Sequence, residues 1–276
     1  MNLFSPAEVA KNYIATGKAK VNTPIWKMIF LGILAGAFIA VGGVASTTAS
    51  VSITAASVGK LVGACVFPGG LAMVLLAGSE LFTGNCLLTL PLLQKEIKVG
   101  GMLKNWVFVY IGNLIGGCLV AAFCAFGHQF SLFGNGMAVS VISTAVAKCS
   151  MPFGDALLKG IMCNFLVCIA VWISFAAKDV AGKIIGIFFP IMMFVLCGFE
   201  HSVANMYYIS AGLFANGIPA YAQAAAAAGV NTSALTLGGF FGANLLPVTI
   251  GNIIGGGVFV GILYGAIYLG KKKEDK

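Results

Sequence analysis

Long apolar runs dominate this chain, and their lengths predict its elements. A helix that crosses a bilayer needs about 20 apolar residues. Four runs fit one helix each: 26–48, 105–128, 157–177 and 246–269. Two further runs, 61–93 and 184–215, carry few charges and are too long for one crossing helix. Since they are also too short for two crossings with a turn, we expect each to be one helix with non-helical backbone in its middle.

Small and helix-breaking residues place the two interruptions. Pro68-Gly69-Gly70 and Gly78 predict a break in the first run, and Cys197-Gly198 predict one in the second. Irregular backbone at membrane depth is tolerated only where it is buried in protein or lines a cavity. The two breaks therefore indicate a pore or a transport site.

Two internal repeats relate the halves of the chain. Residues 78–85 (GSELFTGN) share Gly, Glu and Asn positions with residues 198–205 (GFEHSVAN), and residues 111–117 (IGNLIGG) resemble residues 250–256 (IGNIIGG). Each half then holds three crossings, and an odd number places the halves in opposite orientations. We expect an all-α membrane protein of six transmembrane helices in two inverted repeats, with the second and fifth helices broken.

The composition agrees with a membrane protein. Hydrophobic residues make up 59% of the chain and charged residues only 9%, with a mean hydropathy of +0.99. A soluble domain carries about 25% charged residues. The net charge of +8 lies mostly in tails and loops, which favours contact with anionic lipid and not with nucleic acid. The eight cysteines form no Cys-x-x-Cys pair and histidine is scarce, so we expect neither a metal site nor a cofactor.

The lysines predict the orientation. Cytoplasmic loops of membrane proteins are enriched in positive charge. With the N-terminus inside, only Lys60, Lys148 and Lys159 face outward, and both termini are cytoplasmic. We expect residues 1–25 to form a cytoplasmic amphipathic helix that begins with a capping box at Ser5 and Glu8 and runs to about Gly17. Residues 26–270 then form the channel domain, and residues 271–276 form a basic cytoplasmic tail.

His201 is the strongest candidate for chemistry. It is the one histidine at membrane depth, and it follows Glu200 at the second break. A neutral imidazole donates a hydrogen bond to an anion, and its reference pKa of about 6.5 also permits proton transfer. We further expect backbone N–H groups near 83–85 and 202–205 to face the midplane, with the Thr83 hydroxyl as a further donor.

The other candidates fall into three groups. Glu80 and Glu200 are expected to anchor the loops by accepting backbone N–H bonds, because a free carboxylate opposes anion passage. The predicted apolar gates above and below His201 are Phe67, Leu71, Leu81, Phe82, Phe194 and Val167. Lys148 is expected to attract anions.

Five segments resemble the formate/nitrite transporter family. They are residues 80–83, 104–116, 163–172, 198–206 and 244–252. The run 198–206 (GFEHSVANM) is a specific signature of that family. The resemblance covers nearly the whole chain, and it implies an aquaporin-like fold, a homopentamer with one pore per subunit, and transport of small monovalent anions of weak acids.

The resemblance also implies residue roles. His201 is similar to the central pore histidine of the family, and Lys148 to its vestibule lysine. Polar pore or loop-anchoring positions are implied for Thr83, Asn164 and Asn244. We also expect Asn85 and Asn205, which occupy equivalent places in the repeated frames, to anchor the loops. The loop Thr83-Gly84-Asn85 looks closer to the nitrite and hydrosulphide branches, and the chain most resembles the clostridial hydrosulphide channel. We therefore expect hydrosulphide as the main substrate, and the alternative is proton-coupled transport of formate or nitrite. The expected location is a bacterial inner membrane.

Three other functions are tested against the same residues. A water or glycerol pore fits the helix plan, but neither loop reads Asn-Pro-Ala and the chain has no arginine for a filter. An ammonium or gas pore normally needs paired midplane histidines, whereas His128 lies at a helix end. An intramembrane enzyme would need a nucleophile and base or a metal set, and Ser202 beside His201 is a weak indication of one.

Overall fold

The computed structural model describes residues 3–270, which are predominantly helical. Five helical segments are long and apolar enough to cross a membrane. Three of them are single helices: α2 (Ile25–Ser50), α7 (Val99–Phe126) and α9 (Phe153–Ala176). The fourth, Ala56–Gly78, consists of α3 (Ala56–Val66), α4 (Pro68–Met73) and a π-helical turn (Val74–Gly78). The fifth, Gly239–Leu269, includes α13 (Leu246–Asn252) and α14 (Leu263–Leu269). Shorter helices, α10 (Val180–Leu196) and α11 (Ser202–Asn216), follow one another where the fifth crossing is expected. Their count as one crossing stays a prediction.

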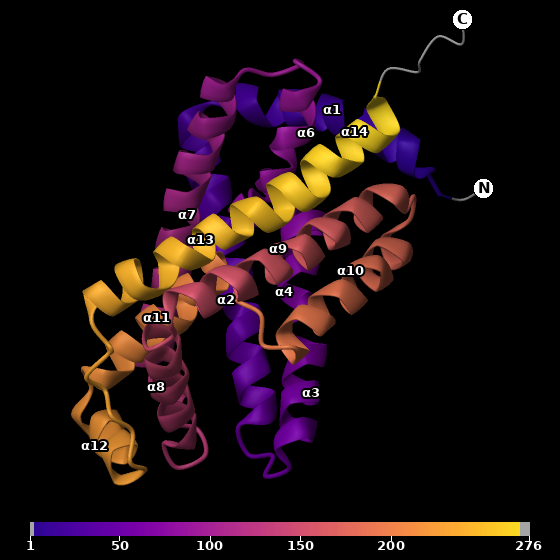
Figure 1. Ribbon diagram of the computed structural model, residues 1–276. Helices are drawn as coiled ribbons and strands as arrows, with labels where there is room; N and C mark the ends of the chain where they lie inside the picture. Colours follow the sequence, from indigo (N-terminus) through magenta and orange to yellow (C-terminus); the bar gives the residue numbers. More distant parts are fainter. Residues whose placement is uncertain (1–2, 271–276) are drawn as a thin grey trace, which may run out of the picture.

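The shorter elements gather at the two ends of the bundle. Figure 1 shows α1 (Pro6–Asn22), α6 (Thr89–Leu93) and α14 at one end, with α8 (Gly136–Cys149) and α12 (Pro219–Ala227) at the other. The predicted capping box is present, because Ser5 and Glu8 exchange hydrogen bonds at the start of α1. The helix runs past the expected end near Gly17 to Asn22, and the predicted basic tail lies outside the described residues.

Glycines let two pairs of helices approach to backbone contact. A Cβ on Gly116 of α7 would overlap the carbonyl oxygen of Ile33 in α2. In the second half, a Cβ on Gly255 would overlap the carbonyl oxygen of Ile161 in α9. Small residues permit close packing of this kind in membranes. The two contacts hold equivalent helix pairs, α2 with α7 and α9 with the C-terminal helix.

The chain breaks once in each half. Gly78 and Gly198 adopt left-handed φ angles of 83° and 70°, which glycine reaches without a Cβ clash. The N–H of Ser79 donates to the Val74 carbonyl, and the N–H of Phe199 donates to the Phe194 carbonyl. These are matching terminations of a helix by a left-handed glycine. Helix resumes after extended residues at α5 (Phe82–Asn85) in the first half and at α11 in the second.

The predicted break in the first run lies at Gly78 and not at the second marker, Pro68-Gly69-Gly70. The backbone stays helical through Phe67 (φ −55°, ψ −36°), and Pro68 begins α4 directly after it. Proline has no N–H, so the helical path loses one hydrogen bond there, but the fixed φ of proline, about −65°, suits helical backbone. The first run is therefore interrupted at residues 79–81 alone.

Candidate functional site

Two buried asparagines fix the loops at the breaks. The Asn113 amide oxygen accepts the Phe82 N–H at 2.9 Å, and its nitrogen donates to the Gly32 and Glu80 carbonyls. Asn252 repeats this, accepting the Ser202 N–H at 2.9 Å and donating to the Gly160 and Glu200 carbonyls. Both asparagines are fully buried. Each one satisfies the first N–H of the resumed helix, which has no partner within that helix.

A second matched set surrounds each glutamate. Asn85 donates to Glu80 at 2.6 Å and to Asn105 at 2.8 Å, while the Lys20 ammonium lies 2.8 Å from Glu80. Asn205 donates to Glu200 at 2.6 Å and to Asn244 at 2.8 Å, and the Lys148 ammonium lies 2.9 Å from Glu200. Asn105 and Asn244 also donate to the backbone carbonyls of the two lysines. Each glutamate is thus paired with a lysine whose backbone carbonyl is held by the same asparagine that contacts the loop.

His201 and Thr83 join the two breaks. The Nε2 atom of His201 lies 2.8 Å from the Thr83 hydroxyl, and the Ala204 N–H donates to Nδ1 at 3.0 Å. Since Nδ1 accepts a hydrogen bond, the proton of a neutral imidazole sits on Nε2 and is donated to the hydroxyl oxygen. The hydroxyl hydrogen of Thr83 then stays free for another acceptor. A protonated ring would have a hydrogen on Nδ1 facing the Ala204 N–H, so this geometry holds the neutral ring.

Two separate cavities approach this pair from opposite ends. We call the first the Lys148 vestibule: its volume is about 420 Å³, and its lining includes Lys148, Glu200, His201, Phe67 and Phe194. The second, the Lys20 vestibule, has a volume of about 220 Å³. Its lining includes Lys20, Tyr13, Lys183, Leu71 and Leu81. The cavities share no lining residue, so a barrier separates them.

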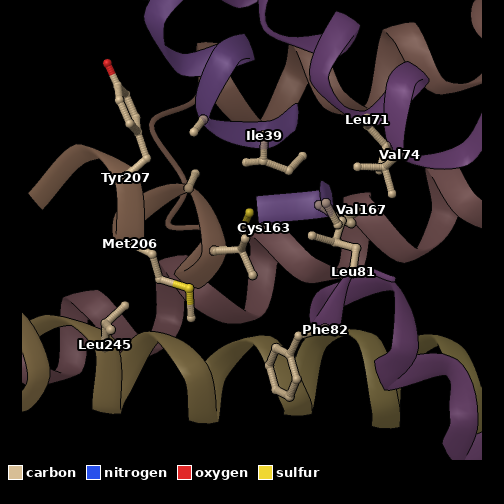
Figure 2. Close-up of a cluster of buried hydrophobic side chains, with 14 of the residues drawn as sticks. Ile39, Leu71, Val74, Leu81, Phe82, Cys163, Val167, Met206, Tyr207 and Leu245 are labelled. Carbon is tan, nitrogen blue, oxygen red and sulfur yellow. The ribbon is translucent and has the colours of Figure 1, made fainter. Parts of the chain in front are cut away.

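The barrier is apolar apart from the Thr83–His201 pair. Phe67 and Phe194 pack edge to face at 5.6 Å, and the Phe194 ring centroid lies 5.8 Å from that of His201. Figure 2 shows Leu81 beside Val167, with Leu71 and Val74 on the neighbouring helix. All of these side chains are buried.

Phe82 lies elsewhere. Its ring packs edge to face against Tyr110 at 4.9 Å and Trp106 at 6.0 Å, both on α7. It lines neither vestibule. Val167 also lines neither cavity, although it adjoins Leu81.

One detail of the sequence interpretation was wrong, and the expectation of free backbone N–H groups does not hold for every residue that it covered. The Ser202 and Ala204 N–H groups are taken by Asn252 and His201, so they do not face the midplane freely. The side chains of Glu80 and Glu200 bind asparagine and lysine side chains instead of backbone N–H groups. Both loops are therefore held mainly by side-chain amides.

Asn164 and Asn244 connect separate segments of the backbone through side-chain hydrogen bonds. Asn164 donates to the carbonyls of Thr83 (3.1 Å) and Asn252 (2.7 Å), which links the two loops across the pseudo-symmetry. Asn244 lies between Asn205 and the Lys148 carbonyl. Each is fully buried, and neither lines a vestibule.

Sequence reasoning missed Lys20 and the roles of Asn113 and Asn252. The repeat of residues 111–117 in residues 250–256 did mark the two asparagines, because each occupies the same place in its copy. No local pattern distinguishes Lys20 from the other lysines near the N-terminus. Its pairing with Glu80 depends on how α1 docks.

Comparison with known proteins identifies the family of this chain. Residues 7–266 match the formate/nitrite transporter family. The chain belongs to that family. It is 42% identical to the uncharacterized transporter YrhG of Bacillus subtilis, over 100% of this chain and 98% of that one. It is 37% identical to the formate channel FocA of Escherichia coli, over 97% and 95%.

Solved structures of the family have the same fold. A "pentameric formate channel with formate bound" superposes with a TM-score of 0.79 at 33% identity, covering 89% of this chain and 98% of that one. An "FNT family ion channel" gives 0.80 at 30% identity, over 93% and 97%. Membership of the formate/nitrite transporter family makes this chain a multi-pass membrane channel or transporter and not an enzyme.

Proposed function

We propose that this protein conducts small monovalent anions of weak acids, with formate and nitrite ahead of hydrosulphide. The observation that carries the proposal is the neutral His201–Thr83 pair, set between two vestibules in an apolar barrier. Relatives named formate channels favour formate, although the sequence alone favoured hydrosulphide. The Thr83-Gly84-Asn85 loop keeps hydrosulphide as a second candidate.

The barrier supports a specific route. An anion that enters an apolar constriction loses its water, and desolvation raises the pKa of its conjugate acid. The Thr83 hydroxyl, whose hydrogen is free while His201 donates to its oxygen, offers one hydrogen bond at the narrowest point. Passage therefore needs either this hydrogen bond to the anion or transient protonation. A strong-acid anion such as chloride gains nothing from the second option.

We propose a homopentamer in a bacterial inner membrane, with both termini in the cytoplasm. Large apolar side chains are exposed over the long helices, among them Phe123, Ile185 and Ile267. Neighbouring subunits and lipid would cover these faces. The similar formate channel of known structure is pentameric, which favours the same assembly here. The distribution of the lysines supports the orientation.

Flux into proteoliposomes tests the function. Purified protein is assayed with formate, nitrite, hydrosulphide and chloride, each at a mildly acidic and a neutral pH, beside empty liposomes. The expected result is flux of the weak-acid anions well above that of chloride, and faster at the acidic pH. Absence of anion flux, together with rapid osmotic swelling by light scattering, would instead identify a pore for water or neutral solutes.

A further inference from the structure

The charge of Lys148 is cancelled inside its own vestibule. Its ammonium lies 3.0 and 2.9 Å from the two oxygens of Glu200, and the exposed fractions of the two side chains are only 14% and 6%. His201 is held neutral by the Ala204 N–H. This ion pair therefore adds little net positive field to the cavity, and a role for Lys148 in attracting anions is weakened.

Lys60 supplies a second lysine to the same cavity. It projects from α3 in the first half of the chain, while Lys148 comes from α8 in the second. Its ammonium lies 4.0 Å from the position that a Cβ on Gly198 would occupy, at the second break. Within residues 3–270, no carboxylate lies within ion-pair distance of Lys60. The vestibule thus contains two lysines and one glutamate, with the excess charge on Lys60.

The serine and threonine hydroxyl groups of the cavity divide into two sets. Ser46, Thr47 and Ser50 donate to backbone carbonyls of their own or a neighbouring helix, so their hydrogens are occupied. Ser140 and Thr144 make no hydrogen bond within the described residues, and both are partly exposed to the cavity. They precede Lys148 by two turns and one turn on the same face of α8. Their hydrogens are available to a solute.

We propose that Lys60, with Ser140 and Thr144, forms the anion-capture site of this vestibule, and that Lys148 serves to position Glu200. An ammonium and two hydroxyl donors suit a small oxyanion with two acceptor oxygens, such as formate or nitrite. Hydrosulphide has one sulfur atom and uses the hydroxyls less well. This inference rests on the proposed anion-channel function and specifies where that anion first binds.

The Lys20 vestibule repeats the charge pattern. Lys20 is paired with Glu80, and Lys183 of α10 is the second lysine there, with no ion-pair partner within the described residues. Two lysines and one glutamate again leave one uncompensated charge. The Thr16, Ser79 and Ser174 hydroxyls of this cavity all donate to backbone carbonyls. The Tyr13 hydroxyl of the same cavity has no hydrogen-bond partner among residues 3–270, so capture at this end has one free hydroxyl donor against two in the Lys148 vestibule, and we expect it to be weaker.

Transport kinetics test the site. Initial rates of formate entry are measured against formate concentration in vesicles whose Lys148 vestibule faces the added anion. Lys60→Gln is expected to raise KM about fivefold at low salt, the effect of one charge near contact distance in water. The maximal rate should stay near wild type, and added salt should shrink the difference. Lys60→Arg should retain most of the wild-type KM.

Matched variants separate the site from general surface charge. Lys159→Gln removes a lysine that lies outside the cavity lining, and its KM should equal that of wild type. The double variant Ser140→Ala, Thr144→Val should raise KM for formate more than for hydrosulphide. A Lys60→Gln protein with wild-type KM and wild-type salt dependence would overturn the capture site. A wild-type protein that carries no anion at all would instead overturn the proposed function.

Discussion

The Nε2 atom of His201 lies 2.8 Å from the hydroxyl oxygen of Thr83, and this single contact connects the two breaks of the chain. One residue belongs to the first loop and the other to the second, 118 residues away. Both are buried, at 3% and 0% exposure. The polar centre of the barrier is therefore shared between the two halves.

Replacing either member of this pair should reduce transport. Thr83→Val keeps the shape but removes the hydroxyl, and flux of formate in proteoliposomes is expected to fall at least tenfold (about 1.4 kcal/mol or more in the barrier). Thr83→Ser is the matched control and should retain most of the flux. His201→Phe should lose flux more severely than His201→Asn, which keeps a hydrogen-bonding side chain. Unchanged rate and unchanged pH dependence in His201→Phe would contradict the role of the imidazole.

Asn113 and Asn252 should be required for folding. Asn113→Leu orphans the Phe82 N–H and the Glu80 carbonyl and removes a second donor from the Gly32 carbonyl, which we expect to cost about 2–4 kcal/mol in total. Thermal unfolding in detergent measures the loss, and Asn252→Leu should behave alike. Asn12→Ala, on the exposed face of α1, serves as the control. A melting temperature for Asn113→Leu equal to that of the control would refute the anchoring.

The Lys148–Glu200 ion pair should show strong coupling. Lys148→Gln leaves a buried carboxylate without its cation, and breaking such a pair costs about 3–5 kcal/mol. The double variant Lys148→Gln, Glu200→Gln should be less destabilised than the sum of the single variants. A smaller coupling is expected for Lys20 and Glu80, since those side chains are more exposed, at 19% and 12%. Additive single effects at residues 148 and 200 would argue against the pairing.

Gly116 should tolerate no side chain. A Cβ there would overlap the Ile33 carbonyl, so Gly116→Ala must separate α2 from α7. We expect a loss of several kcal/mol in stability and a low yield of assembled protein, measured by size-exclusion chromatography. Gly100→Ala in the same helix meets no atom within 4 Å and should fold normally. Equal yields for the two variants would disprove the close approach.

The start of α1 should respond to acid. Hydrogen bonds from the Ser5 backbone and hydroxyl lower the pKa of Glu8 below its usual value. A carboxyl with a depressed folded pKa stabilises the helix above its unfolded pKa, near 4.3. That contribution is lost as pH falls through the folded pKa. The protection factors of amides in the first turn of α1, which correct for the intrinsic pH dependence of exchange, should therefore fall below about pH 4, and Glu8→Gln should abolish this fall.

The sequence by itself determined the approximate positions of the long helices and of the two breaks. Apolar runs predicted helices whose observed limits differ by several residues, as for α7, which begins at Val99 instead of residue 105. The predicted helix began after Lys104 because a charged residue interrupts the apolar run. The helix nevertheless includes this lysine, since its long aliphatic side chain can extend to the membrane surface. Gly78 and Gly198 identified both breaks, because glycine reaches the left-handed conformation at no steric cost. The repeated frames drew attention to the two glutamates, and the position of His201 beside the second break made it a candidate.

Tertiary structure alone decided which of these residues meet. Thr83 and His201, Lys20 and Glu80, and Lys148 and Glu200 are far apart in sequence, and no local propensity encodes their contacts. It also decided that Phe82 packs on α7 and that Lys60 enters the cavity of Lys148. The hydrophobic pattern and backbone sterics depend on residues close together in the chain, so the sequence alone predicts the helices and their breaks. Hydrogen-bond partners and charge compensation depend on distances that exist only once the helices have packed.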